Sequence, residues 1–194
     1  MSDEKPQDTR QRILETGIDL LRRKGFSATG LQEILKASGV PKGSFYHYFS
    51  SKDAFGCALI GHYIATYDER LDLLLAESGD ARTRMMRYWR AWFDDSENGP
   101  LYERCLVVKL AAEVADLSDD MRGLLAKGVD GIIDRLTALI EEGRTDGSIP
   151  AGAPADALAR TLYQMWLGAA LIAKLNRSPT SLEQAMGATR ALLA

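Results

Sequence analysis

The reactive chemistry that this sequence offers is concentrated at Cys105, which Arg104 precedes and Lys109 follows four residues later. Neighbouring cations favour the thiolate, the form of cysteine that attacks quinones, aldehydes, maleimides or hypochlorous acid. Gly99-Pro100 predicts a helix start, so we expect Cys105 in the first turns, where the helix macrodipole also favours negative charge. The competing interpretation is that Cys105 is a small buried apolar residue.

A second group of side chains suits hydrogen bonding to nucleic acid. Phe45 and Phe49 are four residues apart and share one face of a predicted two-turn helix. The remaining faces carry Lys42, Gly43, Ser44, Tyr46 and His47. Lysine and serine can donate to base edges, tyrosine can contact a thymine methyl group or a phosphate, and glycine permits close approach. So short a helix is unstable alone, so a scaffold must hold it.

The elements that position these residues all have helical periodicity, and no segment alternates with the period of a strand. In the first of them, Leu14, Gly17, Ile18 and Leu21 repeat at the spacing of one buried helical stripe. The predicted helices cover 9–24, a short segment after Thr29, the run after Pro41, 52–77, 81–95, 101–115, 118–142, 154–175 and 181–193. Breaks are expected at 78–80, 98–100, 146–150 and 178–179. The chain is therefore expected to be all-α, with about nine helices.

Turn chemistry divides the first 50 residues into three helices. Gly25 suits the end of the first helix and Thr29 suits the N-cap of the second. Gly39 is expected to take a positive φ, and Pro41 suits a first helical turn. Two helices joined by a tight turn and braced by a third form a helix-turn-helix.

The composition is typical of a protein with a hydrophobic core, and the N-terminal segment differs in net charge from the rest of the chain. Hydrophobic residues make up 46% of the 194 residues, and the net charge is −3. Residues 1–56 hold nine Lys/Arg against seven Asp/Glu, whereas the remainder holds fifteen against twenty. A basic head on an acidic body suits a DNA-contacting module attached to a body that avoids DNA.

Several classes of site are disfavoured. Only two histidines and two cysteines occur, so we expect no metal, no cofactor and no structural disulfide. Cys57 lies in an apolar helical face and is read as structural. Without an apolar leader or an 18-residue apolar stretch, the chain is expected to be cytoplasmic, with no membrane partner.

The last two predicted helices are rich in small and apolar residues, so we expect them to form a homodimer interface of four helices. The residues predicted to line it are Leu158, Leu162, Met165, Ala169, Leu182 and Met186. Such a dimer would set two reading helices about one DNA turn apart, on a palindrome.

The run from Gly39 to Lys52, after Gly25-Phe26 and Thr29, resembles the N-terminal domain of TetR-family transcriptional repressors. The resemblance implies a helix-turn-helix domain at 1–52 and a regulatory and dimerisation domain at 53–194. It implies double-stranded DNA, a palindromic operator, as partner. Positions that it assigns to DNA contact are Thr29, Gln32, Lys42, Gly43, Ser44, Tyr46 and His47, with Tyr48 and Lys52 at phosphates.

Residues 105–122 and the run from Trp166 to Lys174 resemble electrophile- and redox-responsive repressors of that family. This second resemblance implies that Cys105 is the sensor, with Lys174 as its partner. Lys174 has a simpler explanation, since its stem can extend along the apolar helix to place the ammonium group at the surface.

Three other functions stay open. The inducer could be a reversibly bound hydrophobic molecule, with Cys105 passive and aromatic residues such as Trp89, Trp92 and Trp166 lining its cavity. A cysteine enzyme would need a histidine base, but both histidines lie at or near the predicted DNA-reading end. A helical adaptor would leave the exposed face of 42–48 unexplained.

Overall fold

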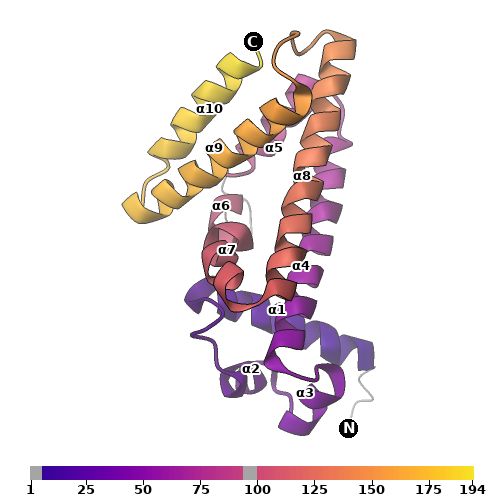
Figure 1. The fold of residues 1–194 in the computed structure, drawn as a ribbon, viewed down its shortest axis with the longest axis vertical. Coiled ribbons are helices and arrows are strands. Elements are labelled where there is room, and N and C mark those ends of the chain that lie inside the picture. The colour runs from indigo at the N-terminus through magenta and orange to yellow at the C-terminus, as the bar shows by residue number, and fades with distance from the viewer. Residues whose placement is uncertain (1–5, 94–99) are drawn as a thin grey trace. The chain divides into compact units, whose positions relative to one another are not determined.

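The computed structural model describes residues 6–93 and 100–194, and the ordered elements among them are helices, as the all-α prediction requires (Figure 1). In chain order they are α1 Pro6–Lys24, α2 Leu31–Ser38, α3 Lys42–Tyr48, α4 Lys52–Leu75, α5 Ala81–Arg90, α6 Leu101–Arg104, α7 Leu106–Leu117, α8 Asp119–Asp146, α9 Ala155–Asn176 and α10 Thr180–Leu192. Among these residues no helix is long and apolar enough to cross a membrane.

One predicted helix is wrong. The segment expected as a single helix over 101–115 is divided at Cys105, which has extended backbone angles (φ −69°, ψ 112°) between α6 and α7. Cys105 is therefore the residue before α7 and does not lie inside a helix. The predicted end of the preceding helix at 95 and the break at 98–99 lie outside the described residues.

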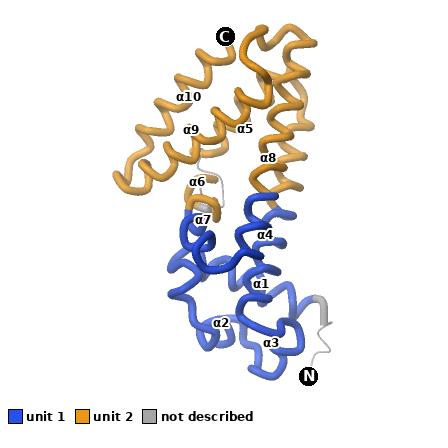
Figure 2. Tube along the Cα trace, in the orientation of Figure 1, with its two compact units in different colours: residues 1–66, 109–127 blue, residues 67–108, 128–194 orange. Residues whose placement is uncertain are grey.

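The chain forms two compact units (Figure 2). The first comprises residues up to 66 and residues 109–127, and the second comprises 67–108 and 128–194. Three helices, α4, α7 and α8, carry residues of both units. The first unit thus contains the helix-turn-helix segment together with most of α7 and the start of α8.

The first unit is built on an apolar stripe of α1. Ile13, Leu14 and Leu21 are almost fully buried at the predicted helical spacing. Gly17 on the same stripe lies so close to α4 that an added Cβ would come within 2.5 Å of the Phe55 ring. This close approach lets the phenylalanines of α3 and α4 pack beneath α1.

The second unit has a core of aromatic residues from α5 and α9. Trp89 and Trp166 stack with ring centroids 4.9 Å apart, and Trp92 packs within 6.0 Å of both. The Trp166 indole donates to the hydroxyl of Thr189, which ties α9 to α10. Farther along, Arg135 of α8 forms ion pairs with Asp68 and Asp72 of α4.

Candidate functional site

The α3 helix is presented by phenylalanine packing. Phe45 and Phe49 are 0% and 2% exposed, and both rings contact Phe55 at the start of α4. Gly39 has the predicted left-handed backbone (φ 66°), which ends α2 and turns the chain toward α3. Since α3 has only seven residues, these aromatic contacts hold it in place.

The other faces of α3 are open to solvent, as the periodicity predicted. Lys42, Gly43, Tyr46 and His47 are exposed, Tyr46 to 47%. Ser44 and Tyr48 are half-buried, and Gln32 on α2 is exposed. The structure therefore brings donors, acceptors and two aromatic rings together on one short helix. Their contact with DNA remains a prediction.

Two residues assigned to DNA contact have internal roles in this unit. Thr29 is fully buried and its hydroxyl donates to the carbonyl oxygen of Gly25 at 2.6 Å. The expectation that Thr29 caps α2 is wrong, because Gly30 is the N-cap. Lys52 Nζ donates to the Phe26 carbonyl oxygen at 3.1 Å and lies over the Phe26 ring.

Cys105 is buried, with 2% of its surface exposed. The preceding helix, α6, is a single turn whose backbone is tied to the end of α5: Leu101 N donates to the Ala91 carbonyl oxygen and Tyr102 N to that of Trp92. The thiol also interacts electrostatically with Tyr88. Burial raises the pKa of Tyr88, against the opposing hydrogen bond that its hydroxyl shares with Tyr67, so the phenol stays protonated.

Lys174 of α9 reaches the segment that carries the cysteine. Its Nζ donates to the carbonyl oxygen of Glu103 at 3.2 Å, two residues before Cys105. The side chain is half-buried. The sequence predicted that the stem of Lys174 extends along α9 toward the surface. In the structure its ammonium group is bonded to α6.

Lys109 and Glu113 of α7 contact the turn between α1 and α2. The Glu113 carboxylate accepts hydrogen bonds from the amides of Phe26 (2.9 Å) and Ser27 (2.6 Å). Lys109 Nζ donates to the carbonyl oxygen of Arg23 at 3.4 Å. Lys109, which the sequence suggested as a neighbour of the thiol, is therefore engaged at the end of α1.

Glu113 was not singled out from the sequence. The available signal was two opposite charges four residues apart, at 109 and 113, in an otherwise apolar run. Burial alone would raise the pKa of Glu113, but hydrogen bonds from Ser27 and Phe26, together with the charge of Lys109, lower it below its ordinary value.

The second cysteine has the environment of a structural residue. Cys57 is half-buried on α4, and its pKa is raised by burial and then by the charges of Asp120 and Asp53. A raised pKa keeps the thiol protonated and slow to react. In the described part of the chain, no three His, Cys, Asp or Glu side chains gather into a possible metal site.

Five of the six residues expected at a dimer interface lie in the core of the single chain. Leu158, Leu162, Ala169, Leu182 and Met186 are at most 9% exposed, and only Met165 is half-buried. The apolar richness of α9 and α10 therefore serves first to pack them against α5, α8 and each other. The exposed apolar residues of these helices are Leu171, Ile172, Leu175 and Leu192.

A helix-turn-helix followed by a helical unit with a large aromatic core defines a DNA-binding transcriptional regulator. Residues 13–55 match the model described as bacterial regulatory proteins, tetR family, and residues 81–189 match the tetracyclin repressor-like C-terminal domain. The chain belongs to the TetR family.

Relatives support this assignment over the full length. The chain is 41% identical to the HTH-type transcriptional repressor NemR of Escherichia coli strain K12, covering 100% of this chain and 98% of that protein. It is 36% identical to the transcriptional regulator AcuR of Cereibacter sphaeroides, over 89% and 79%. The reduced form of E. coli NemR superposes with a TM-score of 0.89 at 42% identity, over 96% and 97%. The chain is thus a TetR-type transcriptional repressor and not an enzyme.

The contact between Glu113 and the turn predicts a pH-dependent loss of stability. Because its folded pKa is depressed, Glu113 stabilises the fold above its ordinary pKa of 4.5, and this contribution is lost as the pH falls below that value. Glu113→Gln should lower the free energy of unfolding at pH 7 by about 1 kcal/mol, a modest value because the carboxylate is partly exposed. Urea unfolding at pH 7 and pH 3.5 measures it.

Asp116→Asn is the matched control, since Asp116 is an exposed acid on the same helix. It should leave stability unchanged at both pH values, and the deficit of Glu113→Gln should shrink at pH 3.5. An equal deficit for both variants would show that the charge of α7, and not the hydrogen bonds of Glu113, is responsible.

Proposed function

We propose that this repressor binds a palindromic operator as a homodimer and is released when an electrophile or oxidant modifies Cys105. The observation that carries the proposal is the position of Cys105. It is buried directly before α7, and α7 carries the residues that contact the helix-turn-helix. A covalent change at the start of α7 can then alter the part of the protein that reads DNA.

The DNA contacts are proposed from the open faces of α3. Lys42, Ser44 and His47 would reach base edges, and Tyr46 a thymine methyl group or a phosphate. Gln32 and Tyr48 would contact the sugar-phosphate backbone of the DNA beside these bases. Thr29 and Lys52 would contribute through the position of the α1–α2 turn, because their polar groups already have partners there.

The dimer surface is proposed to be the exposed apolar stripe of α9. Gly168, Leu171, Ile172 and Leu175 are exposed at the spacing i, i+3, i+4 and i+7, which makes one continuous helical face. Leu175 is 75% exposed and Leu171 51%. A second copy of this face would cover both residues, and Met165 lies half-buried on the same helix.

Access to Cys105 is proposed to come through α6. A four-residue helix has no stability of its own, and the backbone hydrogen bonds to Ala91 and Trp92 and the bond from Lys174 Nζ to Glu103 tie it down. Transient opening of these bonds would expose the thiol. At the start of α7, the positive end of the helix macrodipole would favour its thiolate.

Lys174 is proposed to act on the modified cysteine. Its bond to the Glu103 carbonyl oxygen already brings an ammonium group to the cysteine-bearing segment. When α6 opens, that bond breaks and the ammonium group can approach the thiolate or its oxidised form. NemR has been crystallised in a form named reduced, which suits a relative whose thiols change state.

One observation favours the alternative of a reversibly bound hydrophobic inducer. Trp89 Nε1 is buried and has no hydrogen-bond partner among the described residues. A buried donor without an acceptor costs about 1–3 kcal/mol. A ligand with a hydrogen-bond acceptor beside the tryptophan cluster would satisfy Trp89.

Replacing Tyr46 tests DNA reading. Tyr46→Ala removes an exposed ring from each reading helix of the dimer, so affinity should fall at least about tenfold. The probe is a duplex that wild-type protein selects from a random library, and gel retardation at fixed salt measures binding. Tyr46→Phe keeps the ring, so a smaller loss is expected. Unchanged affinity of Tyr46→Ala would remove α3 from the proposed interface.

Replacing Cys105 tests the trigger. Cys105→Ser should bind the selected duplex like wild type but stay bound when methylglyoxal, N-ethylmaleimide or hypochlorous acid is added, because serine is a far weaker nucleophile. Cys57→Ser is the matched control and should be released normally. Release of Cys105→Ser by the same reagents would refute the covalent mechanism. In that case, a test by dilution follows. If diluting the inducer restores DNA binding, the inducer binds reversibly, as proposed for the site beside Trp89.

Replacing Leu175 tests the dimer surface. Leu175→Glu should shift the protein toward monomer, since it sets a charge into the face that a second copy would cover. Leu73→Glu on α4 is the matched control, because Leu73 is 73% exposed and Leu175 75%. Light scattering coupled to size exclusion measures the mass at several concentrations. If both variants remain dimers, the interface lies elsewhere.

A further inference from the structure

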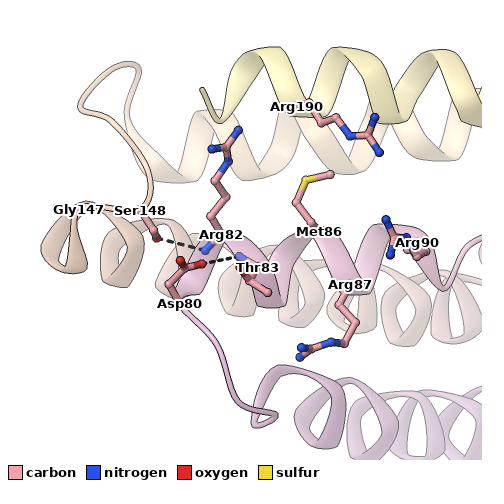
Figure 3. A pocket seen from close by; sticks show the side chains of 9 residues that line it. All are labelled: Asp80, Arg82, Thr83, Met86, Arg87, Arg90, Gly147, Ser148 and Arg190. Carbon is pink, nitrogen blue, oxygen red and sulfur yellow. Dashed lines mark hydrogen bonds between the residues drawn. The ribbon is translucent and has the colours of Figure 1, made fainter.

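A groove of about 710 Å³ in the second unit collects four arginines. Arg82, Arg87 and Arg90 come from α5 and Arg190 comes from α10, while Ser148 follows the end of α8 (Figure 3). Met86 lies between the arginines of α5 and the α10 side of the groove. None of these residues takes part in the DNA-reading helix or in the segment around Cys105.

The carboxylates at this groove are already used by the backbone of α5. Asp80 accepts a hydrogen bond from Thr83 N at 2.8 Å, and Asp146 accepts one from Ala81 N at 3.1 Å. Ser148 Oγ accepts from Arg82 N at 3.2 Å. These bonds cap the first turn of α5. The pKa of Asp80 is lowered by its bond from Thr83, and that of Asp146 by hydrogen bonds from Ser148 and then from Ala81, so both acids are ionised.

The arginines of this unit fall into two groups, those with a carboxylate partner and those without one. Arg84, Arg135 and Arg160 form ion pairs with carboxylates of α8 or α4. Within the groove, Arg87 pairs with Glu77 at 3.2 Å. By contrast, Arg82, Arg90 and Arg190 form no ion pair among the residues that the structure describes.

This concentration of positive charge is unexpected in a chain with a net charge of −3. Like charges on facing helices repel, and among the described residues Asp80, whose pKa the charge of Arg82 helps to lower, is the carboxylate that lines the groove beside its four guanidinium groups. Guanidinium groups bind carboxylates and phosphates through two parallel hydrogen bonds. The volume of the groove lies within the range of about 300–1,000 Å³ that is usual for small-molecule sites.

We propose that this groove binds a small organic polyanion that carries at least two phosphate or carboxylate groups. Arg82 and Arg90 come from α5 and Arg190 from α10, and each would donate to a charged group of the ligand. The thioether of Met86 offers an apolar surface for the carbon frame of the ligand. Bound there, the anion would link α5 to α10 and remove the repulsion between them.

Calorimetric titration of the full-length protein with pyrophosphate and, separately, with citrate tests the site and distinguishes the two anion chemistries. Wild type should bind at least one of them saturably, at constant ionic strength, with a rise in melting temperature. Arg190→Gln should weaken binding about tenfold, and Arg82→Gln combined with Arg190→Gln should abolish it. Arg70→Gln, which removes an exposed charge from α4, should bind like wild type.

Three results would overturn the proposal. The first is the absence of saturable binding of both anions. The second is equal weakening by Arg70→Gln, which would indicate an unspecific response to charge. The third is binding of heparin alone, which would indicate a macromolecular polyanion. Because glutamine keeps most of the arginine stem and removes a repelling charge, melting temperatures without ligand should not fall below that of wild type; if Arg190→Gln melts lower, Arg90→Gln replaces it. Cys105→Ser should bind the anion normally, which separates this site from the electrophile response.

Discussion

The hydrogen bonds from the amides of Phe26 and Ser27 to the Glu113 carboxylate tie α7 to the turn between α1 and α2. The turn that they hold is also the place where Thr29 bonds to Gly25 and Lys52 bonds to Phe26. Gly25 has a positive φ of 88°, and an added Cβ would lie 2.8 Å from Glu113 Oε2. A residue distant in sequence thus holds the turn that leads from α1 into α2.

The α7 helix follows Cys105 in the chain and also contacts the helix-turn-helix segment. Its beginning follows a buried thiol, and its middle carries the polar side chains that contact the helix-turn-helix. A helix transmits displacement along its axis because its backbone hydrogen bonds are short and cooperative. In the proposed mechanism, α7 would therefore be the element that couples Cys105 to the helix-turn-helix.

The parts of the fold that were predictable are those that depend on local chemistry. The spacing of Phe45 and Phe49, the glycine at 39 and the stripe of α1 each determine structure within a few residues, and the structure agrees with them. The break at Cys105 was missed because 101–115 reads as one helix, whereas the tie of α6 to Ala91 and Trp92 is tertiary. Leu162 and Leu182 were assigned to an interface because periodicity identifies an apolar face but not its partner. Glu113 escaped notice because its partners lie 86 and 87 residues away.

The clean separation of faces on α3 has a consequence for how such repressors diversify. Its packing depends on Phe45 and Phe49, while the exposed positions 42, 43, 46 and 47 contribute little to the core. Substitutions at exposed sites away from special features usually change stability by less than about 0.5 kcal/mol. The reading surface can therefore acquire new sequence preferences by mutation while the scaffold stays intact. After a gene duplication, two copies could come to control different promoters while both keep the same regulatory unit.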